Sequence, residues 1–452
     1  MKTQVKNYLI SNHTNMKNLK TIITLFILVL IASCSKDSDE TAAAATPLLA
    51  ITAINPATGP KNTPVTISGT GFSTTPGNNA VTLNGKVCPV VNSTAIQLTI
   101  TIPPSAGSGK IKVAVAGANA ESGNFEFVVT TTAKILAGSG NPGNSDGFGT
   151  SAQFRGPTGL TVDVDGNIFI ADMFNDRIRK ITPAGNVSTV AGSTFGFADG
   201  QGFAAKFHRP SGISVDPTGN LYITDYFNNK IRKISSTGLV STFAGNIEGF
   251  LDGIGTSALF NRPGYITIDN QSNFYVTDSE NRRVRKISAA GVVTTVAGSG
   301  ASVAIDGQGT AASFSTILGL TIDPTGNLFV IDDNGAKIRK ISPAGLMTTF
   351  AGSTTRGFAD GQGAAARFAA VDIVSDAQGN LFVADDENGK IRKITPSGLV
   401  STVAGRGTTI PFLNDNGTST QFNSPNAIAI DANGNIYVSS FANHQIGKIT
   451  FD

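Results

Sequence analysis

The tetrapeptide Ile178-Arg179-Lys180-Ile181 returns throughout the second half of the chain. Its later copies are Ile231–Ile234, Val284–Ile287, Ile338–Ile341, Ile391–Ile394 and Ile446–Ile449, the last of which reads Ile-Gly-Lys-Ile. Successive arginines are separated by 53, 53, 54 and 53 residues. Self-similarity at a regular period of this length is typical of repeat architectures, so the repeat has to be interpreted before any local motif.

Each repeat contains four short strand-like segments that are separated by turn residues. In the second repeat these segments are 212–216, 221–224, 230–234 and 240–244, and Gly219 supplies the positive φ that the first turn needs. Four antiparallel strands per unit form a propeller blade. Six repeats therefore predict an all-β, six-bladed β-propeller over residues 131–452.

The repeats resemble NHL repeats. The resemblance rests on the Asp-x-x-Gly-Asn turn at Asp216–Asn220, on the strand that ends at Asp225 and on the segment from Asn228 to Ile231, and it extends from Lys134 to the end of the chain. The last repeat stops after its third strand, whereas Lys134–Gly138 matches the end of a fourth strand. We therefore expect this N-terminal strand to complete the last blade and close the ring, which removes two exposed strand edges.

A charged pair recurs at fixed positions in five of the six repeats. An Asp ends the second strand of the repeat, and an Arg follows seven residues later, in the third strand. In the sixth repeat both are lost, to Ser440 and Gly447. Because removing one partner of a buried pair leaves an uncompensated charge, we expect each Asp to pair with the Arg of its own blade. The expected pairs are Asp172–Arg179, Asp225–Arg232, Asp278–Arg285, Asp332–Arg339 and Asp385–Arg392.

Residues 48–130 form a separate unit of short alternating segments, a pattern that favours a β-sandwich. This unit resembles an IPT/TIG domain through Pro56, Gly59, Val65–Phe72, Asn84-Gly85, Pro103-Pro104 and Gly107–Val113. The resemblance implies an immunoglobulin-like fold that acts as a spacer or a binding module. Cys88 lacks a nearby His or basic cluster, so we expect a buried, unreactive thiol.

Residues 1–33 have the features of an export signal. Lys17 and Lys20 precede the apolar run 21–31, which is short for a membrane-spanning helix. The segment Ile31-Ala32-Ser33-Cys34 resembles the lipobox of bacterial lipoproteins, which implies cleavage before Cys34 and its acylation. An ordinary signal peptide is the alternative, and either Met1 or Met16 can be the start.

Residues 34–47 would then form a lipidated tether. Its acidic start, Ser35–Glu40, resembles a surface-export signal, so we expect a lipid anchor in the outer membrane and exposure at the cell surface, with the periplasm as the alternative. Four of the 34 basic residues precede Cys34, which leaves 30 basic and 31 acidic residues after it. A net charge of −1 gives no argument for a nucleic-acid partner.

The repeats contain no recognisable catalytic constellation. His208 and His444 lie at different positions of different repeats, which disfavours a zinc site. The expected channel-facing residues of the inner strands are small or apolar: Thr161, Ser214, Thr267, Thr321, Val374 and Ala429. We therefore expect no unique polar residues in the channel.

Two sets of aspartates recur in the repeats and are assigned to turns. One set is Asp163, Asp216, Asp269, Asp323, Asp376 and Asp431, and the other is Asp146, Asp199, Asp252, Asp306 and Asp360, each before a Gly. The sequence predicts no cofactor, although a Ca²⁺ site is left open.

The loops that follow each Ala-Gly vary most between repeats and should gather on one face of the disc. The candidate ligand-binding residues in them are Arg406, Phe412, Arg356 and Phe195, whereas Phe197, Phe250 and Phe358 are expected to pack. We expect a non-catalytic module that binds a protein or a glycan and favour a monomer. A propeller enzyme of the lyase or lactonase type and a structural envelope spacer are the alternatives.

Overall fold

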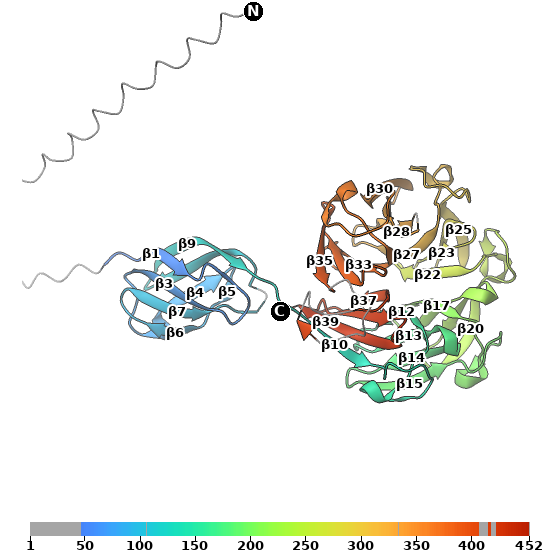
Figure 1. Ribbon diagram of the computed structural model, residues 1–452, viewed down its shortest axis with the longest axis horizontal. Coiled ribbons are helices and arrows are strands. Elements are labelled where there is room, and N and C mark those ends of the chain that lie inside the picture. Colours follow the sequence, from blue (N-terminus) through green and yellow to red (C-terminus); the bar gives the residue numbers. More distant parts are fainter. Residues whose placement is uncertain (1–46, 105, 333, 406–414, 417–421, 452) are drawn as a thin grey trace, which may run out of the picture. The chain divides into compact units, whose positions relative to one another are not determined.

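The computed structural model describes residues 47–104, 106–332, 334–405, 415–416 and 422–451. They form β-strands joined by turns and one-turn 3₁₀ helices (Figure 1). Within these residues, no helix has the length and apolar character needed to cross a membrane. Cys34, Arg406 and Phe412 lie outside the described residues.

The first domain is a sandwich of two sheets, as the alternating pattern predicted. One sheet has the order β1-β3-β7-β6 and the other the order β2-β9-β8-β4-β5. Its core includes Val65, Leu98, Val113 and Phe125, whose side chains are fully buried. The strands are β1 Ala50–Asn55, β2 Thr58–Gly59, β3 Pro64–Thr70, β4 Ala80–Leu83, β5 Lys86–Val87, β6 Val90–Ser93, β7 Gln97–Thr101, β8 Gly109–Val115 and β9 Ala118–Phe127, with η1 Pro76–Asn78 between β3 and β4.

The thiol of Cys88 belongs to this core. The residue is 1% exposed, and burial raises the pKa of the thiol to about 11, against a smaller opposing effect of a hydrogen bond with the backbone of Leu83. At neutral pH the sulfur is therefore protonated and a poor nucleophile.

The repeats form six blades within the described residues, each a five-stranded antiparallel sheet. Four strands follow the sequence prediction, and the fifth is a two-residue strand at the outer edge that the sequence did not indicate. From the innermost to the outermost strand, the first blade is β12 Pro157–Val162, β13 Ile168–Asp172, β14 Arg177–Ile181, β15 Asn186–Ala191 and β11 Gly147–Phe148, and the second is β17 Pro210–Val215, β18 Leu221–Asp225, β19 Lys230–Ile234, β20 Leu239–Ala244 and β16 Gly200–Gln201. In the same order, the third blade is β22 Pro263–Ile268, β23 Phe274–Asp278, β24 Arg283–Ile287, β25 Val292–Ala297 and β21 Gly253–Ile254, and the fourth is β27 Ile317–Ile322, β28 Leu328–Asp332, β29 Lys337–Ile341, β30 Leu346–Gly352 and β26 Gly307–Gln308. The fifth blade is β32 Ala370–Ser375, β33 Leu381–Asp385, β34 Lys390–Ile394, β35 Leu399–Ala404 and β31 Gly361–Gln362.

Short 3₁₀ helices mark two places in the repeats. Two of them lie in the turn between the second and third strands, and five follow the outermost strand. They are η3 Met173–Asn175 and η5 Tyr226–Asn228, and η2 Gly149–Ser151, η4 Gly202–Ala204, η6 Gly255–Ser257, η7 Gly309–Ala311 and η8 Gly363–Ala365.

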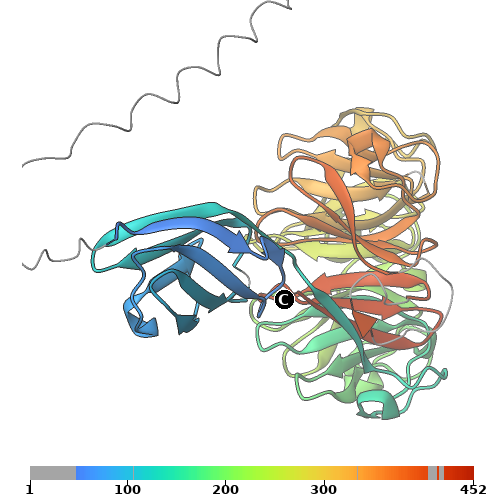
Figure 2. The same ribbon diagram turned by 60° about the vertical axis from the view of Figure 1, so that its left-hand side comes forward.

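The sixth blade is completed from the other end of the domain, which confirms the predicted closure. Strand β10 (Thr131–Ala137) pairs antiparallel with β39 (Gln445–Phe451), and Figures 1 and 2 show the teal β10 beside the red β39. The remaining strands of this blade are β38 (Ile436–Ser440), β37 (Pro425–Ile430) and β36 (Asp415–Asn416). The inner strand β37 contacts β12 of the first blade, so the ring is continuous.

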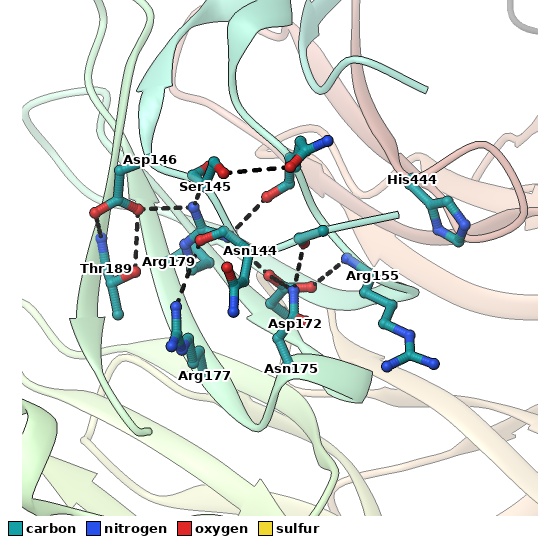
Figure 3. A network of polar contacts seen from close by, with 12 residues as sticks. Asn144, Ser145, Asp146, Arg155, Asp172, Asn175, Arg177, Arg179, Thr189 and His444 are labelled. Atoms are coloured by element: carbon teal, nitrogen blue, oxygen red, sulfur yellow. Dashed lines mark hydrogen bonds and ion pairs between the residues drawn. The ribbon is translucent and has the colours of Figure 1, made fainter. Parts of the chain in front are cut away.

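In the first five blades, the recurring Asp and Arg are in direct contact and fully buried. The Nη1 to Oδ2 distance is 2.5–2.8 Å in all five blades. In the first blade, Asp172 also accepts hydrogen bonds from the backbone N–H of Arg155 and from Asn175 (Figure 3). Asp172 therefore links three parts of the blade: the start of the inner strand, the turn after the second strand, and Arg179 in the third strand.

A second carboxylate binds the other end of each guanidinium. Arg179 Nη2 lies 2.7 Å from Asp146 Oδ1, and Asp146 also accepts the backbone N–H and the hydroxyl of Thr189. The matching distances in the other four blades are 2.5–2.7 Å. The aspartates of the Asp-Gly set, which the sequence analysis assigned only to turns, thus join the loop before each blade to its two outer full-length strands.

The other recurrent aspartates occupy turns, as predicted. Asp216 Oδ1 accepts the backbone N–H groups of Thr218 and Asn220, and its Oδ2 accepts the Asn220 amide. The same bonds to the residues two and four positions later recur at Asp163, Asp269, Asp323, Asp376 and Asp431.

Hydrogen bonds join neighbouring blades, and in each of them the acceptor side chain belongs to a residue with a left-handed backbone. We call each of these hydrogen bonds a staple. Asn229 (φ 55°) accepts the backbone N–H of Arg262 at 2.8 Å, and Asp176 (φ 53°) does the same for Arg209. At the closure between the sixth and first blades the acceptor is the Nδ1 atom of His444 (φ 55°), 3.1 Å from the backbone nitrogen of Gly156. This acceptor is an imidazole nitrogen, which becomes a donor when it is protonated and then cannot accept the N–H of Gly156.

The buried ion pair should behave as a unit on mutation. Asp225→Ser leaves the Arg232 guanidinium without its buried partner, and we expect it to lower the free energy of unfolding by about 3–5 kcal/mol. The double variant Asp225→Ser/Arg232→Met removes both charges and should be less destabilised than Asp225→Ser. Urea unfolding followed by tyrosine fluorescence measures both, because every tyrosine after Tyr8 lies in the propeller. Additive losses would show that the two charges act independently.

The His444 staple predicts a pH-dependent ring closure. Burial and then the charge of Arg155 lower the pKa of His444, whereas a backbone hydrogen bond with Phe441 opposes this. The unfolded chain therefore takes up a proton first, and stability should fall as pH drops below about 6.5. His444→Asn, which carries the acceptor found at Asn229, should lose less stability between pH 7.5 and pH 5 in urea unfolding. Equal losses in both proteins would contradict this role.

Candidate functional site

One face of the propeller collects the residues that differ most between blades. We call the upper face the one that carries the turn between the second and third strands, residues 173–176 in the first blade and the equivalent turns in the others. The loops after Ala-Gly lie beside these turns, because an Asn of the turn donates to a glycine carbonyl of the loop in four blades. The pairs are Asn175–Gly143, Asn228–Gly196, Asn281–Gly249 and Asn388–Gly357.

The predicted packing residues of these loops cover the buried arginines. The Phe197 ring lies 4.8 Å from Arg232 Cζ, and Phe207 lies 5.2 Å from the same atom. Phe250 and Phe358 stack in the same way on Arg285 and Arg392. Each of these three loop phenylalanines therefore packs on a buried arginine, although Phe197, Phe250 and Phe358 remain 50%, 44% and 50% exposed.

The two described candidates for ligand contact lie on different parts of the face. Phe195 is 71% exposed, and its ring centroid lies 5.8 Å from that of His208. Arg356 forms an exposed ion pair with Glu387 at 3.0 Å. The structure therefore brings Phe195 into a group of side chains and gives Arg356 an acidic partner.

A row of aromatic and cationic side chains occupies the upper face over the first three blades. The guanidinium of Arg209 lies 5.1 Å from the rings of both Phe174 and Phe227, and Arg262 lies 5.3 Å from Phe227. Arg209 and Arg262 have φ values of 54° and 51°, a conformation that is uncommon outside glycine. The equivalent Gly156 (φ 59°) and Ser424 (φ 55°) have the same conformation, so it belongs to the repeat. The row is the leading candidate for ligand contact because it combines aromatic and arginine side chains on one face.

The predicted contact residues did not include this row, because the prediction rested on the loops after Ala-Gly and not on the turns after the second strand. A signal for the row exists in those turns. Aligned by the recurring Asp, the second turn residue is Phe174, Phe227, Glu280, Asn334, Glu387 and Ala442 in the six blades. The turn is therefore aromatic in two blades and acidic in two others, which breaks the sixfold symmetry.

The central channel contradicts the expectation that it holds no unique polar residue. A cavity of about 130 Å³ is lined by residues from all six inner strands, including Tyr265 and Asp372. The other blades carry Gly159, Gly212, Gly319 and Ala427 at this position. A Cβ atom on Gly159 would lie 2.3 Å from the carbonyl oxygen of Ser211, which explains the preference for glycine.

Asp372 is a buried carboxylate that bridges two blades. It is 7% exposed, and its oxygens accept the backbone N–H groups of Ile373 and of Ile428 in the sixth blade. Burial raises the pKa of Asp372 to about 7, against the opposing effect of these two N–H groups. Burial and then the nearby charges of Asp372 and Asp386 raise the pKa of Tyr265.

Among the described residues, no group of three or more His, Cys, Asp or Glu side chains has an arrangement that could hold a metal ion. His208 packs against Phe227, with ring centroids 4.9 Å apart, and His444 belongs to the closing staple. The two histidines therefore have separate surroundings.

Comparison with known proteins identifies both parts of the chain. The IPT/TIG domain model matches residues 49–129, and the NHL repeat model matches residues 207–234. The chain is 28% identical over 342 residues to NHL repeat-containing protein 2 of Bos taurus, covering 68% of this chain and 41% of the relative. It is 25% identical over 352 residues to human Teneurin-4, covering 67% of this chain and 12% of the relative. The chain thus spans less than half the length of either relative.

Solved structures share the fold over most of the chain. A structural genomics protein of unknown function from Bacteroides thetaiotaomicron superposes with a TM-score of 0.60 at 21% identity, covering 90% of this chain and 99% of that protein. An auxiliary nutrient binding protein from the same organism gives a TM-score of 0.55 at 18% identity, with coverage of 90% and 98%. The chain carries an IPT/TIG domain followed by NHL repeats that form a six-bladed β-propeller.

Proposed function

We propose that the protein is a non-catalytic binding module, exported and lipid-anchored through Cys34, that recognises a protein or glycan ligand on the upper face of its propeller. The observation that carries this proposal is the row formed by Phe174, Arg209, Phe227 and Arg262. The rest of each repeat is accounted for by the ion pair, the turns and the blade cores.

Two further points support a binding role. Exposed aromatic and arginine side chains are the residue types that dominate binding energy at interfaces. The auxiliary nutrient binding protein from Bacteroides thetaiotaomicron shares this fold over nearly its whole length, which makes a similar role a reasonable hypothesis for this chain. The export signal and the lipobox-like Cys34 would place such a module outside the cytoplasm.

A ligand screen with matched variants tests this proposal. The full-length protein should bind selectively to one class on glycan and extracellular-protein arrays. Phe174→Asn/Phe227→Asn, which copies the fourth blade, should weaken that binding about tenfold or more, as expected for the loss of two aromatic anchors. Val164→Asn is the control, because Val164 is 92% exposed in the opposite turns and Asn270 stands there in the third blade. Unchanged affinity in the double variant would show that the site lies elsewhere. The absence of any selective ligand would favour a structural spacer.

A second candidate is a propeller enzyme of the lyase or lactonase type. The presence of Asp372 and Tyr265 in the central cavity favours it. The contacts of Asp372 favour a structural role, because its two oxygens bind backbone N–H groups of two adjacent blades. We therefore expect Asp372→Asn to retain ligand binding. Turnover of a bound ligand that disappears in Asp372→Asn, with the fold intact, would instead support the enzyme.

Asp372 should also leave a signature in the pH dependence of stability. Its raised pKa means that the folded protein keeps a proton that the unfolded chain releases at about pH 3.9, so stability contributed by this group falls as pH rises from about 4 to about 7. Urea unfolding of Asp372→Asn at pH 5 and pH 8 should therefore show a smaller loss on raising the pH than the parent protein. Asp165→Asn, an exposed turn position, is the control, and identical slopes for Asp372→Asn and the parent would show that Asp372 stays ionised.

A further inference from the structure

The upper face contains a pocket of about 360 Å³ between the first and second blades. Its lining combines two arginines, a histidine, a carboxylate and two phenyl rings from both blades. These residues are Arg155, Phe174, Asp176, Phe195, His208 and Arg209. The combination suits a small ligand that has both an apolar surface and a negative charge.

The two arginines of the pocket are exposed, and their guanidinium groups have no hydrogen bond or ion pair with any described residue. Figure 3 shows the Arg155 side chain pointing away from the Asp172–Arg179 network. The rings of Phe174 and Phe227 flank the guanidinium of Arg209, each at 5.1 Å. The two rings therefore hold the guanidinium between them, and its N–H groups can donate to a planar anion.

Other arginines on the same face already have partners. Arg262 lies 3.5 Å from Glu280, and Arg356 lies 3.0 Å from Glu387. Arg282 and Arg283 donate to backbone carbonyls. The pocket thus differs from the rest of the row in offering cations whose donors are unused.

The single acid of the pocket does not cancel this charge. Asp176 Oδ1 accepts the backbone N–H of Arg209 at 2.8 Å, and burial raises the pKa of this carboxyl, against the opposing effects of that N–H, His208 and Arg209. Two guanidinium groups against one partly buried carboxyl leave a net positive pocket even with His208 neutral.

The phenyl rings supply the apolar part of the site. Phe195 is 71% exposed and Phe174 is 36% exposed, so both present ring surface to solvent. Flat aromatic surface of this kind stacks on the apolar face of a sugar ring, and 360 Å³ accommodates a single ring with part of its neighbour. A ring that carries one carboxylate matches both halves of the pocket.

We infer that this pocket binds an acidic sugar of the hexuronate type, within an oligosaccharide or polysaccharide. Its carboxylate lies against Arg155 and Arg209, and its ring packs on Phe174 or Phe195. The inference rests on the proposed function, because it names the ligand class of the same upper face. An acidic peptide is the competing ligand that shares the charge but lacks the ring.

A matched ligand pair tests the role of the charge. Isothermal titration of the full-length protein should detect oligogalacturonate, and the fully methyl-esterified oligomer, identical except for the neutralised carboxylates, should bind about tenfold or more weakly, since charge-assisted hydrogen bonds to both arginines are lost. Affinity for the acidic oligomer should also fall as the salt concentration rises. Equal binding of the two oligomers would overturn the inference.

Protein variants locate the site. Arg155→Gln/Arg209→Gln should lose about tenfold or more in affinity for oligogalacturonate. Its unfolding midpoint should stay close to that of the parent, because neither guanidinium has a hydrogen bond or ion pair to lose, and exposed cation–π contacts such as those of Arg209 with Phe174 and Phe227 contribute little. Arg367→Gln, an exposed arginine of the fifth blade, removes a charge elsewhere and should bind like the parent. Equal losses in Arg367→Gln would reduce the effect to net charge and overturn the assignment of the pocket.

The outcomes separate this inference from the proposal on which it rests. Selective binding of a neutral glycan or a protein, without binding of acidic sugars, would overturn the inference and leave the binding module intact. Binding of polyglutamate that depends on Arg155 and Arg209, without binding of the sugar, would assign the pocket to acidic peptides. A folded protein that binds no ligand of any class would remove the proposed function itself.

Discussion

The buried guanidinium in five of the six blades is the interaction on which the rest of the propeller depends. A guanidinium without access to water needs acceptors for its N–H groups, and in each of these blades it has two carboxylates. Through them it ties together the start of the inner strand, the turn after the second strand, the third and fourth strands and the loop from the previous blade. The Arg–Asp network therefore fixes the turns and loops that build the upper face.

The sixth blade shows what replaces this network where the ring closes. Its fourth strand, β10, comes from the other end of the domain, and the Arg and Asp positions carry Gly447 and Ser440. Gly447 pairs with Ile135 of β10, and the Ser440 hydroxyl donates to the backbone carbonyl of Asn423. The closing blade thus links Ser440 to the segment before its inner strand without a buried Asp–Arg pair, and the His444 staple joins it to the first blade.

The sequence was sufficient for features that recur and insufficient for features that occur once. Six copies made the strand order, the closure by Lys134–Gly138 and the Asp–Arg partners readable, because loss of both partners in one repeat is informative. Asp372 was missed because only one position of each inner strand, Val374 in the fifth blade, was compared between the repeats. Asp372 lies two residues earlier, in unbroken register with Val374, so alternation places both on the same side of the strand. The pocket escaped because its lining comes from two blades, and only the fold brings Phe174 beside Arg209.

The central claim is that repeated residues build the scaffold, whereas residues that break the symmetry on the upper face bind the ligand. Amide hydrogen exchange of the full-length protein with and without its ligand tests this claim most directly. The account predicts slower exchange in residues 153–157, 173–176, 193–197 and 207–210, and unchanged exchange in the Asp163–Asn167 turn and its equivalents on the opposite face. Protection confined to those opposite turns or to the IPT/TIG domain would contradict it.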